Sequence, residues 1–261
     1  MDVNSTKQVK DKRIKFVVRL ILVCALCAAA YFGFLLFQVF QMYAEGDRYY
    51  DDLRERVLEV QDEPRREDLS ANQVSTPSPS VDFQALQDEN ADTIAWIYSP
   101  GTEINYPVVM ASDYAWYFEH LLDGTKNANG VPFLDFNSKP DLSGRLNIFY
   151  GRDIRTGKMF GSLDEYKNQA YFDAHPTLYL YSEEKSYKIN LVYGCSLEDG
   201  LWRDRAFMYE INLDALITYA SACSTFTSDY QYSDKDAFVV LVASESGLNN
   251  VQYLVIGVID D

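Results

Sequence analysis

Histidine, cysteine and basic residues are all scarce in this sequence of 261 residues. Its 2 histidines and 4 cysteines are too few for a disulfide-built scaffold or a histidine-rich metal site. Lys and Arg together number 23 and Asp and Glu 39, so the formal net charge is −16. Because phosphate binding needs clustered basic side chains, nucleic acid is not expected as a partner. No metal ion or other cofactor is expected either.

Charged residues are absent from one long stretch near the N-terminus, residues 20–44. At about 1.5 Å per residue, a helix of this length crosses a hydrocarbon core of roughly 30 Å, which predicts a transmembrane helix. Residues 1–19 contain six basic and two acidic side chains, so the positive-inside rule predicts a cytoplasmic N-terminus and an extracellular C-terminal part. A cleaved signal peptide is the alternative. Bulky residues such as Phe37 and Phe40 occupy the place of a small-residue cleavage site, which favours an uncleaved, single-pass anchor in the cell membrane.

The rest of the chain divides into three expected parts. Residues 45–60 are charged and carry apolar side chains at helical spacing, which predicts a juxtamembrane helix. Residues 61–80 contain three prolines and few large apolar groups, so we expect a linker that lifts the folded part off the membrane. Residues 81–261 are the expected globular domain, which opens with a short helix over residues 81–90.

Short runs of aromatic and β-branched residues dominate the globular domain. Many such runs with few helical interruptions predict a mostly β fold that closes into a barrel. Helical segments are expected at Met159–Lys167 and Leu213–Cys223. The expected strands are Thr93–Tyr98, Ile104–Val109, Val131–Asp135, Leu146–Tyr150, Thr177–Tyr181, Tyr187–Tyr193, Ala237–Ala243 and Gln252–Ile259.

Several motifs follow one another along this domain. The early ones are NADTIAWIYSPGTEINYPVV (90–109), SDYAWYFEHLLDGTKNANGVPFLDF (112–136), LNIFYGRD (146–153) and MFGSLDEY (159–166). The later ones are HPTLYLY (175–181), YKINLVYG (187–194), VVLVAS (239–244) and QYLVIGVI (252–259). This ordered set resembles class B sortases, the membrane-anchored cysteine transpeptidases of Gram-positive cell surfaces. The resemblance covers about residues 81–261 and implies an eight-stranded sortase-like β-barrel with class B helical additions.

Class B sortases use a cysteine, a histidine and an arginine. The thiolate attacks a threonine carbonyl of a sorting-signal peptide and forms an acyl-enzyme, from which an amine takes the acyl group. The surface protein is thereby attached to the cell wall or to a pilus. The histidine protonates the leaving amine, and the arginine stabilises the developing oxyanion. In this sequence the resemblance places Arg152 at the histidine position, Ser244 at the cysteine position and Gln252 at the arginine position.

These three substitutions remove the chemistry of the family. A serine hydroxyl is essentially un-ionised near pH 7 and needs a general base. Arg152 is permanently protonated and cannot be that base, and Gln252 carries no charge. Losing even one such group typically costs two or more orders of magnitude in rate. We therefore expect a pseudo-sortase in which Arg152, Ser244 and Gln252 bind sorting-signal peptides or partner proteins without transferring them.

Two other interpretations stay open at this point. The first is an active sortase that uses Ser244, helped by Glu245, or another nucleophile such as Cys195. The second is a purely structural scaffold, anchored in the membrane as a partner of a catalytically competent sortase. Under either, Arg152 has the simpler option of a surface ion pair, for example with Asp153 or with Asp135.

The remaining histidines and cysteines carry no clear catalytic signal. His120 and His175 are expected to be surface or locally hydrogen-bonded residues rather than substitutes for the family histidine. Cys195 and Cys223 both lie in the globular domain, and the sequence leaves open whether they form a disulfide, because the geometry of the bond cannot be deduced from spacing.

Overall fold

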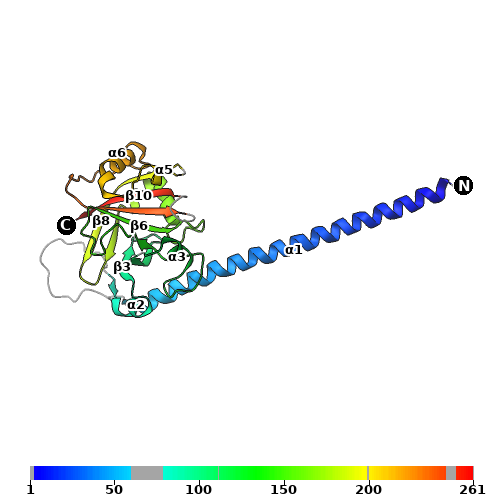
Figure 1. Ribbon diagram of the computed structural model, residues 1–261, viewed down its shortest axis with the longest axis horizontal. Helices are drawn as coiled ribbons and strands as arrows, with labels where there is room; N and C mark the ends of the chain where they lie inside the picture. The colour runs from blue at the N-terminus through cyan, green and yellow to red at the C-terminus, as the bar shows by residue number, and fades with distance from the viewer. Residues whose placement is uncertain (1–2, 60–78, 111, 199, 245–250, 261) are drawn as a thin grey trace. The chain divides into compact units, whose positions relative to one another are not determined.

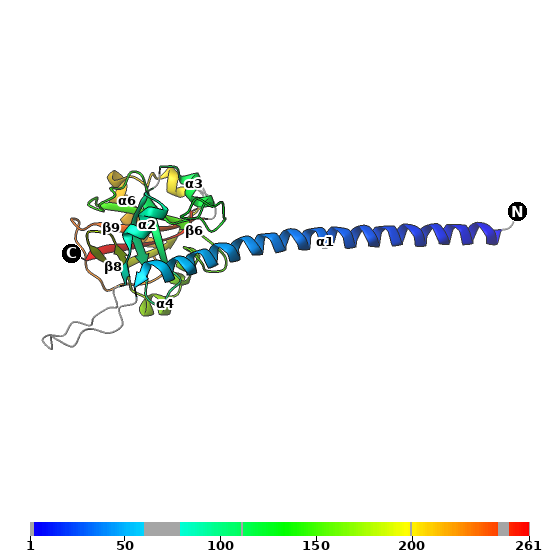
Figure 2. The same cartoon turned by 90° about the horizontal axis from the view of Figure 1, so that it is seen from below.

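The computed structural model describes residues 3–59, 79–110, 112–198, 200–244 and 251–260, and its elements can be followed in Figures 1 and 2. The helical elements are α1 (Val3–Val57), α2 (Phe83–Glu89), α3 (Tyr114–Glu119), η1 (Gly161–Lys167), α4 (Gln169–Ala174), α5 (Leu201–Asp204), η2 (Glu210–Asn212) and α6 (Leu213–Cys223). The strands are β1 (Leu58–Glu59), β2 (Ser80–Val81), β3 (Thr93–Tyr98), β4 (Asn105–Met110), β5 (Phe133–Leu134), β6 (Leu146–Arg152), β7 (Thr177–Tyr181), β8 (Ser186–Ser196), β9 (Phe238–Ser244) and β10 (Val251–Asp260).

Eight of these strands close into a barrel in the order β10-β8-β7-β3-β4-β5-β6-β9. The pairs β4–β5 and β6–β9 are parallel, and the other pairs are antiparallel. Closure pairs the strand edges that an open sheet would expose. The eight-stranded barrel expected from the sequence is thus confirmed, and β3 and β7 have the predicted bounds.

In the core of the barrel, buried and exposed residues do not alternate along strands β6 and β9. Every residue of β9 and the first six residues of β6 are buried, a pattern typical of strands that are covered on both faces. Trp202 of α5 packs edge-on against Tyr150 of β6, with ring centres 6.4 Å apart, and so covers part of that strand from outside the sheet. Large side chains such as Trp96 and Phe149 are also fully buried.

The short helices were harder to predict than the strands. The sequence did not predict α3 or α4, whose main local signals are the capping side chains of Asp113 and Asn168, which accept hydrogen bonds from Ala115 N and Ala170 N. The helix predicted from residue 159 begins two residues later as the 3-10 helix η1, because Met159 has a left-handed φ of 54° that a helix cannot include. The bounds of α6 are as predicted.

Contacts divide the chain into two compact units, Met1–Glu45 and Gly46–Asp261, and α1 contributes to both. In the first unit the large apolar side chains between Phe16 and Phe40 are exposed. By length and composition this part of α1 can cross a membrane, a property that a signal sequence near an N-terminus shares.

The second unit includes the last turns of α1, residues 46–57. Tyr50, Leu53 and Val57 of this segment are buried, and the Tyr50 hydroxyl donates a hydrogen bond to Gly130 O at 2.5 Å. Arg54 donates to Asn105 O at 3.1 Å. The folded unit therefore begins at Gly46 rather than at residue 81, since an amphipathic pattern reveals a buried helix face but not the surface that the face packs against.

The two sides of the expected linker are held together. Residues 60–78 lie outside the described residues, but Leu58 pairs with Val81 in the β1–β2 ladder. Asp82 N also donates to Val57 O at 2.9 Å. The residues that flank the segment 60–78 on either side are therefore next to each other.

Truncating Leu53 tests whether the end of α1 belongs to the barrel core. We expect Leu53→Ala to lower the free energy of unfolding by about 2–5 kcal/mol, because it empties a fully buried site. In thermal unfolding of the full chain in detergent this corresponds to roughly 5 to 15 °C. Asp52→Ala, at the neighbouring exposed position, is the matched control. Equal unfolding temperatures for the two variants would show that the segment is not part of the core.

Candidate functional site

Three strand ends meet at one end of the barrel. Because β6 and β9 are parallel, their last residues lie side by side, and Arg152 is the register partner of Ser244. Strand β10 runs antiparallel to β9 and begins at the same end, where Val251 pairs with Ser244. The sequence-predicted positions 152 and 244 are thus adjacent across two strands that are far apart in the chain.

Gln252 lies at the same strand ends, at a local irregularity. The β9–β10 register shifts between Val251, which pairs with Ser244, and Tyr253, which pairs with Ala243. A shift of this kind places two residues of one strand opposite one residue of the other. The backbone therefore puts Gln252 within one residue of the Ser244 pair. The side chain of Gln252 and all of residues 245–250, including Glu245, lie outside the described residues.

Ser244 is fully buried, with an exposed fraction of 0%. Its backbone carbonyl accepts a hydrogen bond from Asp153 N at 2.9 Å, which continues the β6–β9 ladder by one residue. A buried hydroxyl becomes a nucleophile only when a base removes its proton. Its register partner on the neighbouring strand is instead Arg152, whose guanidinium is always protonated at physiological pH.

Arg152 is half-buried at the end of β6. Its Nε is buried and has no hydrogen-bond partner among the described residues. Leaving a buried donor of a charged group unsatisfied is unfavourable, so such a group is a natural place for an acceptor from outside the chain. The carboxylate of Asp135, one of the two partners expected for Arg152, already accepts hydrogen bonds from the hydroxyls of Tyr114 at 2.8 Å and Tyr150 at 3.1 Å.

The Asp135 cluster is a support of the site that the sequence did not reveal. Asp135 is completely buried directly after β5, and its second oxygen accepts from the backbone and side chain of Asn137. Burial, and next the negative charge of Asp135, raise the pKa values of Tyr114 and Tyr150, so both phenols stay protonated and donate. The cluster fixes β5 against the C-terminal half of β6.

The turn after β6 is closed tightly. Phe160 N donates to Arg152 O at 2.9 Å, and Met159 N donates to the hydroxyl of Tyr106 in β4 at 3.1 Å. Gly151 lies directly under the Phe160 ring, where a Cβ atom would come within 2.5 Å of it. The backbone at Arg152 is therefore held by a packed turn rather than by an open loop.

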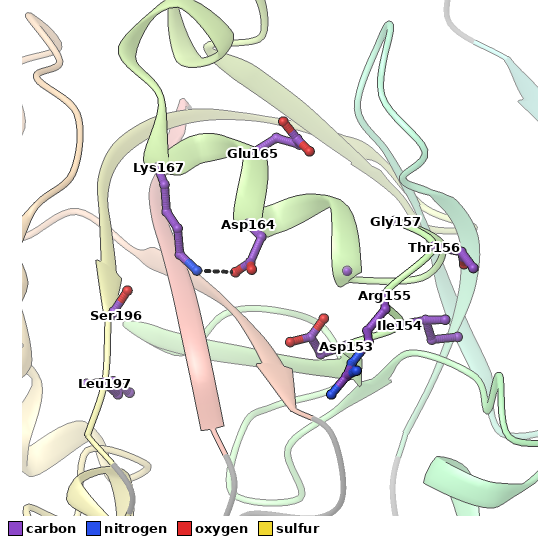
Figure 3. A pocket seen from close by; sticks show the side chains of 11 residues that line it. Asp153, Ile154, Arg155, Thr156, Gly157, Asp164, Glu165, Lys167, Ser196 and Leu197 are labelled. Carbon is purple, nitrogen blue, oxygen red and sulfur yellow. Dashed lines mark ion pairs between the residues drawn. The ribbon is translucent and has the colours of Figure 1, made fainter.

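A pocket of about 570 Å³ adjoins this turn. Figure 3 shows that its lining side chains come from the segment after β6, from η1 and from the end of β8. Arg152, Ser244 and Gln252 do not line it, but Asp153 does, and so does Ser196, which pairs with Tyr253 across β8 and β10. The lining residues are Asp153, Ile154, Arg155, Thr156, Gly157, Gly161, Asp164, Glu165, Lys167, Ser196 and Leu197.

Charges of both signs surround the pocket. Lys167 Nζ lies 2.8 Å from Asp164 Oδ1, as drawn in Figure 3, and 5.1 Å from the centre of the Tyr253 ring. Arg155 and Glu165, both exposed, add one charge of each sign. Such a surface suits the backbone and polar side chains of a peptide more than an apolar ligand. Sequence reasoning missed this pocket because exposed charged residues of a short helix carry no distinguishing pattern.

The two histidines are engaged elsewhere. Nδ1 of His120 lies 2.8 Å from Trp116 O, and its ring stacks on the indole of Trp116 with centres 3.6 Å apart. Nδ1 of His175 lies 2.9 Å from Pro100 O. Neither residue lies on the strand ends that meet at Ser244; the His120 bond is local, as expected, whereas His175 is bonded to a residue 75 positions away.

Cys195 is poorly suited to replace the family nucleophile. Its side chain is buried near the end of β8. Burial, followed by the interaction with the Cys223 thiol, raises the pKa of Cys195 well above that of an ordinary thiol. The thiol is therefore protonated at neutral pH. No group of three His, Cys, Asp or Glu side chains within the described part of the chain could hold a metal ion.

Comparison with known proteins gives a consistent set of relatives. No family model matches the chain. It is similar to sortase B of Listeria monocytogenes, with 26% identity over 162 residues; the match covers 61% of this chain and 65% of the relative, slightly less than two thirds of its length. The crystal structure of sortase B from B. anthracis in complex with AAEK1 has a TM-score of 0.64 at 22% identity, over 84% of this chain and 98% of that one. A Staphylococcus aureus sortase B–substrate complex has a TM-score of 0.60 at 22% identity, over 69% of this chain and 84% of that one.

A methyl group at Gly151 should damage the turn that holds Arg152. We expect Gly151→Ala to destabilise the protein by about 1–3 kcal/mol, because its Cβ would clash with the Phe160 ring. Gly144→Ala is the matched control, since the nearest atom to its added Cβ would be 3.7 Å away. Thermal unfolding of both variants measures the difference. A Gly151→Ala protein as stable as the Gly144→Ala protein would mean that Phe160 does not pack there.

Proposed function

We propose that this chain, a class B sortase-like protein, binds sorting-signal peptides or a partner protein at the end of its barrel without transferring them. The observation that carries the proposal is the buried, unpartnered Nε of Arg152 beside Ser244. A peptide carbonyl or a terminal carboxylate is the acceptor that this guanidinium lacks. In the same proposal, Ser244 and Gln252 contribute neutral hydrogen-bonding groups.

Chemical reasoning supports binding over turnover. Acyl transfer needs an activated nucleophile and a group that protonates the leaving amine. Arg152 can donate hydrogen bonds to a bound acceptor, yet it neither removes a proton from Ser244 nor gives one to an amine at useful rates. The positive charge of Arg152, the register partner of Ser244, can still orient a carbonyl group of a bound peptide. Orienting that group contributes to binding and not to acyl transfer. The same residue therefore favours holding a peptide and disfavours cutting it.

The relatives make a peptide the most suitable ligand. One of the solved sortase B structures is a substrate complex, and the fold of this chain follows it over 69% of its length. An extended peptide presents alternating carbonyl and amide groups, which match a site of strand ends that includes the buried, unpartnered Nε of Arg152. The charged pocket beside Asp153 is positioned to receive residues that flank the bound segment.

We further infer that the protein is anchored in the cell membrane of a Gram-positive organism by residues 20–44. In this arrangement residues 1–19 are cytoplasmic and the barrel is extracellular. The exposed apolar side chains between Phe16 and Phe40 support an apolar surrounding for this part of α1. An extracellular barrel would meet the sorting signals of exported proteins at the membrane surface, where a competent sortase is a plausible partner.

A binding measurement tests the proposal. The full chain in detergent is titrated into fluorescent sorting-signal peptides, and anisotropy and chromatography are recorded on the same samples. We expect saturable binding without cleavage, weakened about ten-fold or more in Arg152→Ala, which loses a charge-assisted hydrogen bond. Arg205→Ala, at an exposed arginine that does not line the pocket, should bind like the wild type.

Other outcomes would contradict the proposal in different ways. Peptide cleavage that is abolished by Ser244→Ala would establish an active serine enzyme. Absence of binding to every peptide, with a folded protein, would leave the scaffold as the remaining interpretation.

Restoring the family residues tests whether the site itself is intact. We expect the combined variant Arg152→His, Ser244→Cys and Gln252→Arg to gain acyl transfer that is abolished by a thiol-alkylating reagent, because a thiolate, an acid and a cation return to adjacent strand ends. The matched control carries Ser244→Ala in place of Ser244→Cys and should be inactive. A folded but inert triple variant would mean that these strand ends no longer form a peptide site.

A further inference from the structure

Two cysteines from different elements approach each other on the outside of β8. Cys195 is the penultimate residue of β8 and Cys223 is the last residue of α6. The chain that follows α6 is hydrogen-bonded to the residue before Cys195: Thr225 N donates to Gly194 O at 2.7 Å. Gly194 N in turn donates to Ser224 Oγ at 3.3 Å. These bonds hold the two backbones against each other directly beside both cysteines.

The side chains complete the approach. Cys195 is completely buried, whereas Cys223 is half-buried. The thiol of Cys223 is close enough to raise the pKa of Cys195, after the larger effect of burial, and Cys223 Sγ lies 3.2 Å from Tyr219 O in the preceding turn of α6. The pair is reduced in this structure. Two cysteines whose neighbouring residues are hydrogen-bonded to each other are suitably placed for a disulfide, which needs closely spaced backbones.

We propose that Cys195 and Cys223 are a redox-active dithiol that closes into a disulfide in the presence of a small disulfide oxidant. This inference goes beyond the proposed peptide binding and does not depend on it. It assigns a modification site to the end of β8, where Cys195 pairs with Leu254 of β10. No other residue of the described chain is required for the step.

Exposure sets the order of the two exchange steps. The Cys223 thiolate attacks the oxidant disulfide, forms a mixed disulfide and releases one thiolate of the oxidant. Cys195 then loses its proton to solvent and attacks the Cys223 sulfur, which forms the protein disulfide and releases the second thiolate. Two electrons pass from the protein to the oxidant. Cys195 is the resolving residue, because a buried thiol is the poorer first nucleophile.

Closure would connect α6 to the strand that forms one wall of the pocket. Ser196 and Leu197, which line the pocket, directly follow Cys195. The disulfide would close a loop of about 30 residues that includes α5, η2 and α6, which restricts the unfolded chain and stabilises the folded one. The oxidised protein should therefore hold this wall more firmly than the reduced protein does.

Peptide mapping of the full chain tests the site directly. The detergent-solubilised protein is incubated with oxidised glutathione, remaining thiols are alkylated, and a non-reduced tryptic digest is analysed by mass spectrometry. The sequence predicts that Cys195 occurs in peptide 189–203 and Cys223 in peptide 206–235. We expect these two peptides linked, and an unfolding temperature higher by roughly 5 to 10 °C than in the reduced protein.

Variants separate this result from general oxidation. Cys223→Ser should abolish both the linked peptide and the thermal shift, whereas Cys24→Ala with Cys27→Ala should retain both. Cys195→Ser should stop the reaction at the mixed disulfide of Cys223 with glutathione. Recovery of peptides 189–203 and 206–235 as separate alkylated thiols from the wild type, or as separate glutathione adducts, would overturn the proposal.

Discussion

The parallel ladder between β6 and β9 is the constraint on which the site depends. Parallel neighbours must be joined by a crossover, and here the crossover comprises residues 153–237, with β7, β8 and α6 among them. Because the two strands run in the same direction, they end side by side, and Arg152 is the register partner of Ser244. The short antiparallel connection from β9 to β10 adds the start of β10. Any shift of the β6–β9 register would separate these residues, so the buried apolar side chains of the two strands also fix the site.

The same geometry makes the fold independent of the residues at positions 152 and 244. The barrel is held by strands buried along their length, by the Asp135 cluster and by the last turns of α1, and none of these requires a particular residue at 152 or 244. A buried polar residue at such a position lowers the stability of the fold unless its polar atoms have hydrogen-bond partners. The unpartnered Nε of Arg152 is therefore easier to explain by an external ligand than by its contribution to folding.

Much of the fold followed from the sequence, because the barrel strands are continuous apolar runs bounded by polar turns. β3 and β7 have their predicted bounds, and all eight expected strands are strands of the barrel. The short helix α3 was missed because six residues give too little periodicity to recognise. The burial of the end of α1 was missed for a different reason, since the partners come from distant segments: Tyr50, for example, contacts Tyr106 and Gly130.

The candidate site, like the fold, was predicted from the sequence only in part. Its three positions came from the order of motifs, and the register of β6, β9 and β10 then places their backbones together. The pocket lined by Asp164, Lys167 and Ser196 had no sequence signal, because three elements contribute to it. The proximity of Cys195 and Cys223 likewise depends on how the end of α6 is hydrogen-bonded to β8, which spacing along the chain does not determine.

The account predicts that no covalent bond forms between the protein and a bound peptide. Intact-protein mass spectrometry tests this most directly, with the full chain incubated with sorting-signal peptides and quenched in acid over a time course. The unmodified mass of the protein is predicted at every time point, even at saturating peptide. An acyl adduct that maps to Ser244 and is absent from Ser244→Ala would contradict the account.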